Sequence, residues 1–337
     1  MAAVRLKDIA KDLGVSTVTV SKVLRGNPEI GEKTRARVLK RVRELNYQPN
    51  MQARGLAGGR SFTAGLVVPD LVHPFFGEFA KSLGGALRAS GLGLMLASSE
   101  EDPEIEVQEI RTLLNRGVDV LLVASCQTLE SESLFFGDGA RPLLLIDRNF
   151  TKIGASFVGS DDVQVGEMGT RHLISLGRKH VAHIGGQGMS PAVDRQAGYR
   201  KAMAAAKIKV PANFVVTRDR IEESGDSVGY YAMQELLSQG ARPDAVFCYN
   251  DLSALGAMKA AMQAGLRIPE DIAFVGCGNL RYAEYLKVPL TSIDHGTERL
   301  GVAAANLASQ LAESPLSLAQ TVLLEPRLMV RRSSVAE

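Results

Sequence analysis

The sequence VRLKDIAKDLGVSTVTVSKVL, residues 4–24, has the pattern of two short helices joined by a tight turn. Apolar residues recur at helical spacing from Leu6 to Leu13, which predicts one buried face. Gly14 then permits a left-handed backbone conformation that other residues resist. Ser16 is a favourable N-cap for the second helix, because its side-chain oxygen can accept a hydrogen bond from a free amide of the first turn.

The outer face of the second helix carries small polar and methyl-bearing side chains together with one cation. These outward-facing residues are Thr17, Val18, Ser21 and Lys22. Hydroxyl groups can bond base edges or phosphates, and methyl groups can contact thymine, so this face suits the floor of a DNA major groove. The alternative interpretation is a helical hairpin whose outer face is only solvated.

The charge distribution favours the DNA-binding interpretation. Residues 1–60 hold 13 Lys and Arg against 5 Asp and Glu, a net charge of +8. The whole chain holds 39 against 37, so residues 61–337 hold 26 against 32, a net charge of −6. A basic segment joined to an acidic body is typical of a phosphate-binding module attached to a part that does not bind nucleic acid.

Length and composition indicate a globular protein of two or three domains, with 337 residues, 45% apolar and 23% charged. No apolar run reaches the ~18 residues of a membrane span. Charged residues interrupt any signal-peptide core near the N-terminus. Three well-separated cysteines have no metal-ligand spacing and are expected to be buried thiols. We therefore expect a cytoplasmic location and no membrane partner.

A third helix and a linker follow the first two helices. The third helix is predicted over 33–45, with Val38, Leu39, Val42 and Leu45 on its inner face, and it completes a headpiece of residues 1–48. Residues 49–60 include NMQARGLAGG, which is too short and too rich in glycine to form a stable helix alone in water. This segment is either a simple linker or a hinge that folds only on DNA, with Leu56 as an apolar wedge in the minor groove.

From residue 61 onward, short aliphatic runs alternate with helical segments, which predicts an α/β core of parallel sheets built from right-handed βαβ units. The expected strands are 64–68, 92–96, 120–123, 143–146, 181–184, 214–216, 245–247 and 272–275. The expected helices are 75–90, 103–116, 163–176, 192–207, 227–239 and 251–264. Eight strands divide into two sheets, and we expect an N-subdomain of about 62–161 plus 292–323 and a C-subdomain of about 162–290 plus 324–337.

Polar and aromatic side chains follow many of these strands, where ligands of such domains bind. The candidate effector-binding residues are Asp70, His73, Phe75, Phe76, Asp147, Arg148, Arg195, Asn250, Asp251 and Asn279. A cleft with aromatic rings, arginine and aspartate can hydrogen-bond and stack on a small polar ligand. For each residue alone a structural role is about as plausible, but the set as a whole favours binding.

No catalytic, cofactor or metal constellation is expected. The segment 185–188, GGQG, lacks the spacing of a dinucleotide fingerprint. No serine occupies a G-x-S-x-G elbow. The sequence therefore predicts a protein that is not an enzyme and that uses neither a cofactor nor a metal.

With these motifs in hand, the chain resembles the lactose-repressor (LacI/GalR) family of bacterial transcription regulators over essentially its whole length. The motifs are LKDIAKDLGVSTVTVSKVL, ELNYQPN with ARGLAGG, VPDLVHPFF, IDR, DRQAGY, YNDLSALGAM, IPEDIAFVG and PLTSID. The resemblance implies a homodimer whose paired headpieces read a pseudo-palindromic double-stranded operator. It also implies a core like a periplasmic sugar-binding protein, with a small-molecule effector between two subdomains.

The resemblance also implies roles for individual residues. Base-reading positions are matched by Thr17, Val18 and Lys22, and positions that contact the DNA backbone by Ser16, Thr19, Ser21, Asn27, Thr34 and Tyr47. Leu56 matches the hinge residue that intercalates at the operator centre. Phe75, Arg195 and Asp251 match effector contacts.

Some positions depart from the family pattern. Gly278 occupies a position where an effector-reading Asp is usual, His73 replaces a frequent Asn, and His295 replaces a frequent Gln. The chain has no tryptophan that could stack on a ligand. The longer stretch 218–227 offers Arg220 or Ile221 instead.

The expected function is that of a DNA-binding repressor that is switched by a small polar effector, with a sugar or sugar derivative as the leading candidate. The alternatives are a core that responds to a protein partner, or one that binds a nucleobase or nucleoside.

Overall fold

The computed structural model describes residues 4–24, 27–47, 60–128, 136, 139, 141–218, 225–240 and 242–335. The chain divides into two compact units, Met1–Ser61 and Phe62–Glu337. The first is helical in its described part, and the second is an α/β core.

The headpiece consists of the helices α1 (Leu6–Leu13), α2 (Thr17–Leu24) and α3 (Glu32–Glu44). Gly14 ends α1 with a φ of 64°, the left-handed conformation expected there. The three helices enclose a small core of Ile9, Ala10, Val20, Val23 and Val38. Leu39, predicted on the inner face of α3, is instead 39% exposed, because Val38 occupies the central position of that face.

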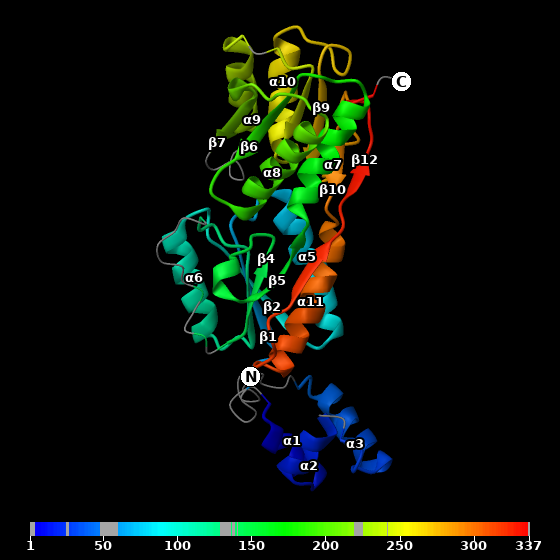
Figure 1. The fold of residues 1–337 in the computed structure, drawn as a ribbon. Coiled ribbons are helices and arrows are strands. Elements are labelled where there is room, and N and C mark those ends of the chain that lie inside the picture. The colour runs from blue at the N-terminus through cyan, green and yellow to red at the C-terminus, as the bar shows by residue number, and fades with distance from the viewer. Residues whose placement is uncertain are drawn as a thin grey trace. The chain divides into compact units, whose positions relative to one another are not determined.

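The core contains two six-stranded sheets (Figure 1). The N-subdomain sheet has the order β11-β5-β4-β3-β1-β2, and all its strand pairs are parallel. Its strands are β1 (Thr63–Val68), β2 (Gly93–Ser98), β3 (Val120–Val123), β4 (Leu143–Ile146), β5 (Ser156–Ser160) and β11 (Thr321–Leu324).

The C-subdomain sheet has the order β12-β10-β9-β8-β6-β7 and is parallel except for β12, which runs antiparallel to β10. Its strands are β6 (Val181–Gly186), β7 (Val215–Arg218), β8 (Ala245–Cys248), β9 (Ala273–Cys277), β10 (Thr291–Asp294) and β12 (Arg327–Met329). The α/β class with two mainly parallel sheets, predicted from the alternating pattern, is confirmed.

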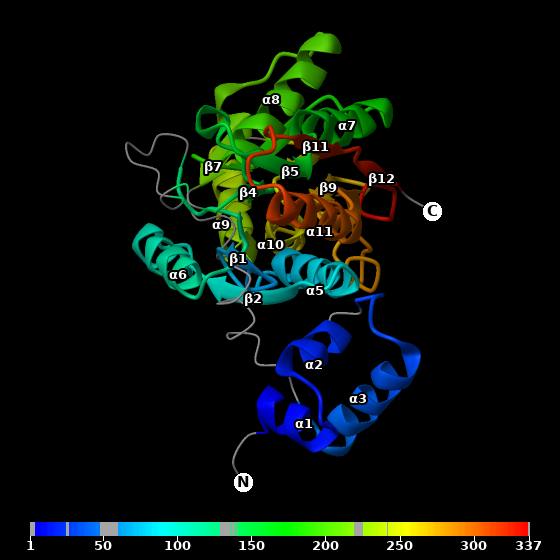
Figure 2. The ribbon, with the colours of Figure 1, turned by 90° about the horizontal axis from the view of Figure 1, so that it is seen from below.

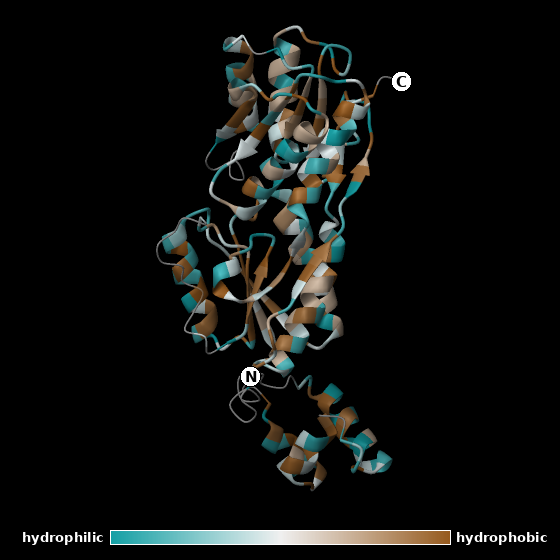
Figure 3. Ribbon diagram, in the orientation of Figure 1, coloured by the Kyte–Doolittle hydropathy of each residue, from teal (hydrophilic) through white to brown (hydrophobic). Residues whose placement is uncertain are grey.

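Helices cover both faces of each sheet, so that the apolar strands lie in the interior (Figures 2 and 3). In the N-subdomain, α5 (Pro74–Ala89) packs with α11 (Thr297–Glu313), and α6 (Pro103–Asn115) contacts β1, β2 and β3. In the C-subdomain, α7 (Asp162–Ser175) pairs with α8 (Ser190–Ala205), and α9 (Gly225–Ser238) pairs with α10 (Asp251–Gln263).

The described residues form twelve strands in place of the eight predicted ones. The predicted set omitted β5, β10, β11 and β12 because their sequences are short and contain polar residues. The N-subdomain segment predicted to begin at residue 292 begins later, because β10 pairs with β9 in the C-subdomain sheet. The chain therefore crosses between the sheets near Asp161, His295 and Glu325. The first and third crossings lie side by side, because Ser160 Oγ donates to the carbonyl oxygen of Leu324.

Candidate functional site

The start of α2 has the geometry that the sequence predicts. Ser16 Oγ accepts a hydrogen bond from the Thr19 amide at 3.0 Å and therefore caps the helix. Thr17 and Val18 follow on the first turn, and both are exposed, Val18 at 59%. Because more than half of this apolar side chain is exposed, it is available to contact a partner.

Lys22 lies further along α2 and forms an ion pair within the headpiece. Its Nζ atom lies 2.8 Å from Glu29 Oε2, in the turn that follows α2. Ser21, beside it, is partly buried. The structure thus leaves Thr17, Val18 and Lys22 at the surface, while their contact with DNA stays a prediction.

The other predicted DNA-backbone contacts have local structural partners. Asn27 Oδ1 accepts from the Glu29 amide at 2.8 Å and shapes the turn. Thr34, on α3, is partly buried, and Tyr47 packs on the headpiece core, where burial raises the pKa of its phenol. Leu56, Arg220 and Ile221 lie outside the described residues.

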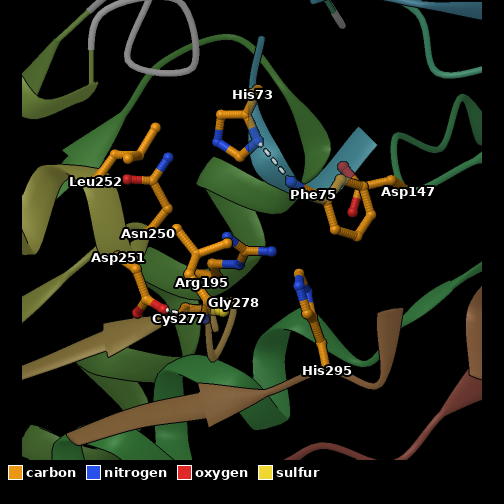
Figure 4. Close-up of a pocket in the computed structure, with 11 residues that line it drawn as sticks. His73, Phe75, Asp147, Arg195, Asn250, Asp251, Leu252, Cys277, Gly278 and His295 are labelled. Atoms are coloured by element: carbon orange, nitrogen blue, oxygen red, sulfur yellow. Dashed lines mark hydrogen bonds between the residues drawn. The ribbon is translucent and has the colours of Figure 1, made fainter. Parts of the chain in front are cut away.

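A pocket lies between the two subdomain sheets at the carboxyl ends of their strands (Figure 4). It encloses about 350 Å³, including the space that opens to solvent. Its lining contains six of the ten predicted effector residues, His73, Phe75, Asp147, Arg195, Asn250 and Asp251. Strand-end position is therefore the signal that located most of this pocket.

Arg195 is the cation of the pocket, and it is fixed by the C-subdomain. Its Nε donates to Asp162 Oδ1 at 2.7 Å, and its Nη1 donates to the Tyr249 carbonyl oxygen at 2.9 Å. The guanidinium carbon also lies 4.7 Å from the centroid of the Tyr249 ring. Burial alone would lower the pKa of Arg195, but the Asp162 carboxylate raises it, so the guanidinium stays charged.

Asp251 begins α10 and ties together two neighbouring segments. Its Oδ1 accepts from Ser292 Oγ at 2.6 Å, and its Oδ2 accepts from the Leu280 amide at 2.8 Å. Burial raises the pKa of this carboxyl group to about 6. Because the protein itself uses both oxygens, Asp251 shapes the pocket wall as well as lining it.

The side chain of Asn250 caps a helix with its oxygen and leaves its nitrogen for another contact. Its Oδ1 accepts from the Ser253 amide at 2.8 Å and caps α10. Its Nδ2 is buried, and among the described residues it has no hydrogen-bond partner. Since an unsatisfied buried donor is costly, this amide nitrogen is suited to donate to an acceptor on a bound ligand.

Ring side chains form the opposite wall of the pocket (Figure 4). His73 caps α5 by accepting from the Phe75 amide at its Nδ1, at 3.3 Å. The Phe75 ring lies 5.0 Å from the ring of His295, measured between centroids. These rings offer flat faces on which a ligand ring can stack.

The structure places the other four predicted effector residues outside this lining. Asp70 Oδ1 accepts from the Val72 amide, and Phe76 is buried in the N-subdomain core. Arg148 Nη1 donates to the Ser125 carbonyl oxygen at 2.7 Å, and Nη2 donates to Glu101 at 3.0 Å. Asn279 Oδ1 accepts from Arg331 Nη2 at 2.7 Å. Their role in effector binding stays a prediction.

Five lining residues were absent from the predicted site, namely Leu252, Cys277, Gly278, Leu280 and His295. Cys277 is the last residue of β9 and Gly278 directly follows it, so the strand-end rule could have found them. Gly278 has a φ of 128°, which strains any residue with a β-carbon, and an aspartate there would therefore be strained. Leu280 and His295 come from loops, whose position the sequence pattern does not give.

Two features common in other protein classes do not occur in the described ranges. No cluster of three or more His, Cys, Asp or Glu side chains there could hold a metal ion. No helix there is both long enough and apolar enough to cross a membrane.

Comparison with known proteins matches both units of the chain. Residues 5–50 match the family model "bacterial regulatory proteins, lacI family", and residues 170–334 match the model of a periplasmic binding protein-like domain. The chain is 33% identical over 332 residues to the HTH-type transcriptional repressor PurR of Klebsiella pneumoniae, covering 97% of this chain and 96% of that protein.

Other relatives agree. The ribose operon repressor of Haemophilus influenzae is 33% identical and covers 97% of this chain and 98% of its own length. A structure of the lac repressor dimer bound to operator and the anti-inducer ONPF matches with a TM-score of 0.82, 26% identity and coverage of 99% of this chain and 100% of that one. A complex of the regulator CelR with cellobiose matches with a TM-score of 0.74, 30% identity and coverage of 98% and 99%. The chain therefore belongs to the lacI family of bacterial regulatory proteins and is a transcriptional regulator that binds DNA.

Proposed function

We propose that this protein is a homodimeric repressor that reads a pseudo-palindromic operator through α2 and is switched by an uncharged polar ring compound in the core pocket. The observation that carries the effector part is the buried Asn250 Nδ2, a donor that no described residue satisfies. The DNA part is supported by the exposed Thr17 and Val18 on α2 and by the net charge of the first 60 residues.

The charges of the pocket favour an uncharged ligand. Its lining contains one cation, Arg195, and two acidic groups, Asp147 and Asp251. The cation is already paired with Asp162 at 2.7 Å. An anionic ligand would therefore approach an excess of carboxylates in a partly buried site, where repulsion is weakly screened. Sugar phosphates and sugar acids are expected to bind poorly.

A neutral sugar matches the polar groups and rings of the pocket lining. Its oxygens can accept from Asn250 and Arg195, its hydroxyls can donate to Asp147, and its apolar face can pack on Phe75. The names of the ribose operon repressor and of the CelR–cellobiose complex support this class. A nucleobase or nucleoside is the second candidate, because the rings of Phe75 and His295 offer stacking surfaces.

The test is a thermal-shift screen of the full-length protein against neutral sugars, nucleobases, nucleosides, sugar acids and sugar phosphates. A ligand that binds only the folded state raises the melting temperature in a concentration-dependent way. We expect hits among the neutral compounds. Hits confined to anions would contradict the charge argument, and a complete blank would favour a protein partner as the signal.

The matched variant for this screen is Asn250→Ser. Serine can still accept from the Ser253 amide and cap α10, but it lacks the amide donor. We expect an unchanged fold and a loss of at least about tenfold in ligand affinity, the ~1.4 kcal/mol of one hydrogen bond in a buried site. Arg195→Ala is a poorer probe, because it would leave Asp162 buried without its partner.

The hinge prediction is tested at Leu56, whose assignment rests on the family resemblance. Leu56→Ala is expected to weaken specific operator binding while non-specific binding, which is mainly electrostatic, is retained. The measurement is a titration of each variant with operator and with non-operator duplex at two salt concentrations. Equal losses on both duplexes would remove Leu56 from the wedge position.

A further inference from the structure

The turn that follows α2 is built so that a carboxylate lies against the lysine of the candidate DNA-reading surface. The Asn27 amide donates to the Lys22 carbonyl oxygen at 3.0 Å, and Asn27 Oδ1 accepts from the Glu29 amide at 2.8 Å. Arg35 Nη2, from α3, donates to the Asn27 carbonyl oxygen at 2.7 Å. These three bonds hold Asn27 and the Glu29 amide in place, and Glu29 Oε2 lies 2.8 Å from Lys22 Nζ.

Folding stability gives little reason for this pair. The Lys22 and Glu29 side chains are 39% and 69% exposed, and exposed ion pairs contribute only about 0–1 kcal/mol to the free energy of unfolding. A carboxylate on a surface that approaches DNA also repels phosphates and weakens the electrostatic part of binding. Glu29 therefore acts against DNA affinity, and the selection of sequence is the property that it can improve.

The chemistry of lysine explains how Glu29 can improve selection. The ammonium group has three donors on a flexible stem, and it can reach either a base edge or a phosphate. A phosphate contact adds affinity to every sequence, whereas a contact with guanine O6 or N7 adds affinity to one base pair. An ammonium group that donates one hydrogen bond to Glu29 keeps two donors for a base. The same bond restrains it from turning toward the phosphates of the DNA backbone.

We propose that Glu29 is a positioning residue for DNA reading, which holds Lys22 toward the base edges and so raises sequence specificity at the expense of affinity. This inference rests on the proposed reading of DNA by α2. It predicts that removing the charge of Glu29 makes the protein bind DNA more tightly and less selectively.

The experiment uses the full-length chain and a pool of randomised DNA duplexes, from which bound sequences are selected and read. The variants are Glu29→Gln, which keeps the size of the side chain and removes its charge, and Glu44→Gln as a matched control. Glu44 is also a headpiece glutamate in exposed ion pairs, with Arg41 at 3.1 Å and Lys40 at 3.9 Å, both within α3. Affinity for one fixed random duplex is measured in parallel over a range of salt.

We expect Glu29→Gln to bind the fixed duplex several-fold more tightly, with a salt dependence steeper by about one phosphate contact. In the selected sequences, the preference at one base pair of each half-site should fall by up to about fivefold, because an exposed ion pair restrains its lysine by at most about 1 kcal/mol. Glu44→Gln should select the same sequences as the wild type. If the Glu29→Gln variant selects the same DNA sequences as the wild type, the proposal is overturned.

Two further outcomes distinguish this proposal from an alternative role of Glu29 and from a failure of the proposed function. If Glu29→Gln changes base preference equally in a Lys22→Ala background, then Glu29 reads a base itself, for instance a cytosine amino group, and the positioning role is wrong. If the wild type enriches no sequence at all, the proposed operator reading fails first, and the inference falls with it.

Discussion

His183 is a buried imidazole that its surroundings keep neutral. Its ring stacks between Tyr199 and Phe247, with centroids 5.2 Å from each. Its Nδ1 donates to the Phe247 carbonyl oxygen at 3.0 Å, which fixes the tautomer, because a carbonyl can only accept. Burial lowers the pKa of His183 to about 4.

This pKa predicts how stability changes in acid. The ordinary pKa of histidine is 6.5, and that of His183 in the folded state is about 4. Between these two pH values the unfolded state binds a proton that the folded state excludes. The contribution of His183 to the free energy of unfolding therefore falls as the pH falls. Asp251 has the opposite sign. Its pKa is raised from 3.8 to about 6, so its contribution falls as the pH rises through that interval.

The two contributions oppose each other in the same pH range, and a single substitution should separate them. His183→Phe keeps a ring between Tyr199 and Phe247 but removes the titrating group, so it should remove the loss of stability in acid and make the variant relatively more stable near pH 4 than near pH 6. Urea denaturation midpoints at these two values, compared with the wild type, measure the effect. If the difference between the two midpoints is the same in the variant as in the wild type, His183 does not titrate as its burial implies.

At the scale of the elements, α7 and α8 approach closely enough to exclude side chains. A β-carbon on Gly166 would collide with the Arg195 carbonyl oxygen, and one on Gly198 would collide with the Val163 carbonyl oxygen. Backbone atoms cannot turn away as side chains can, so the helices would have to separate. Because α8 carries Arg195, this helix contact also fixes the cation of the pocket.

Gly166→Ala is therefore expected to lower the free energy of unfolding by about 1–3 kcal/mol, the usual cost of overpacking, and to weaken effector binding. Gly85→Ala is the control. Gly85 is exposed on α5, and its added β-carbon would meet only Arg88 Nη2 at 3.9 Å. This change should stabilise the protein by about 0.5–1 kcal/mol, the gain of alanine over glycine in a helix. Chemical denaturation of both variants decides the comparison, and equal effects would contradict the packing argument.

The strands also show which elements a sequence pattern can predict and which it cannot. Strands such as β3 and β8 are buried on both faces, so their continuous apolar runs are visible in the sequence. The edge strands β11 and β12 alternate or end after a few residues, and no local signal distinguishes them from loops. The polar residues that follow β8 predicted Asn250 in the pocket, and Arg195 was predicted from the start of the helix that follows β6. His295 lies at a chain crossing whose path depends on tertiary packing.

At the scale of the whole molecule, the core is made of two sheets joined by three neighbouring chain crossings. A ligand bound between them contacts both subdomains, so it can shift their relative arrangement only by binding one arrangement better than another. If the effector changes operator affinity, the operator must change effector affinity by the same factor, typically 5- to 150-fold. Calorimetric titration of effector into the protein with and without operator measures this factor, and unequal factors would show that the two ligands do not share one equilibrium.

The crossings also bear on how the protein is made. The N-subdomain core takes Leu300, Ala304, Leu307 and Leu311 from α11, although its first strand is at residue 63. A ribosome that has translated the first 290 residues has therefore produced most of both sheets, but not the helix that closes the first one. The headpiece needs only residues 1–48, so we expect it to fold early in synthesis. The core can fold only after nearly the whole chain has been made, and it is exposed to chaperones and proteases until then.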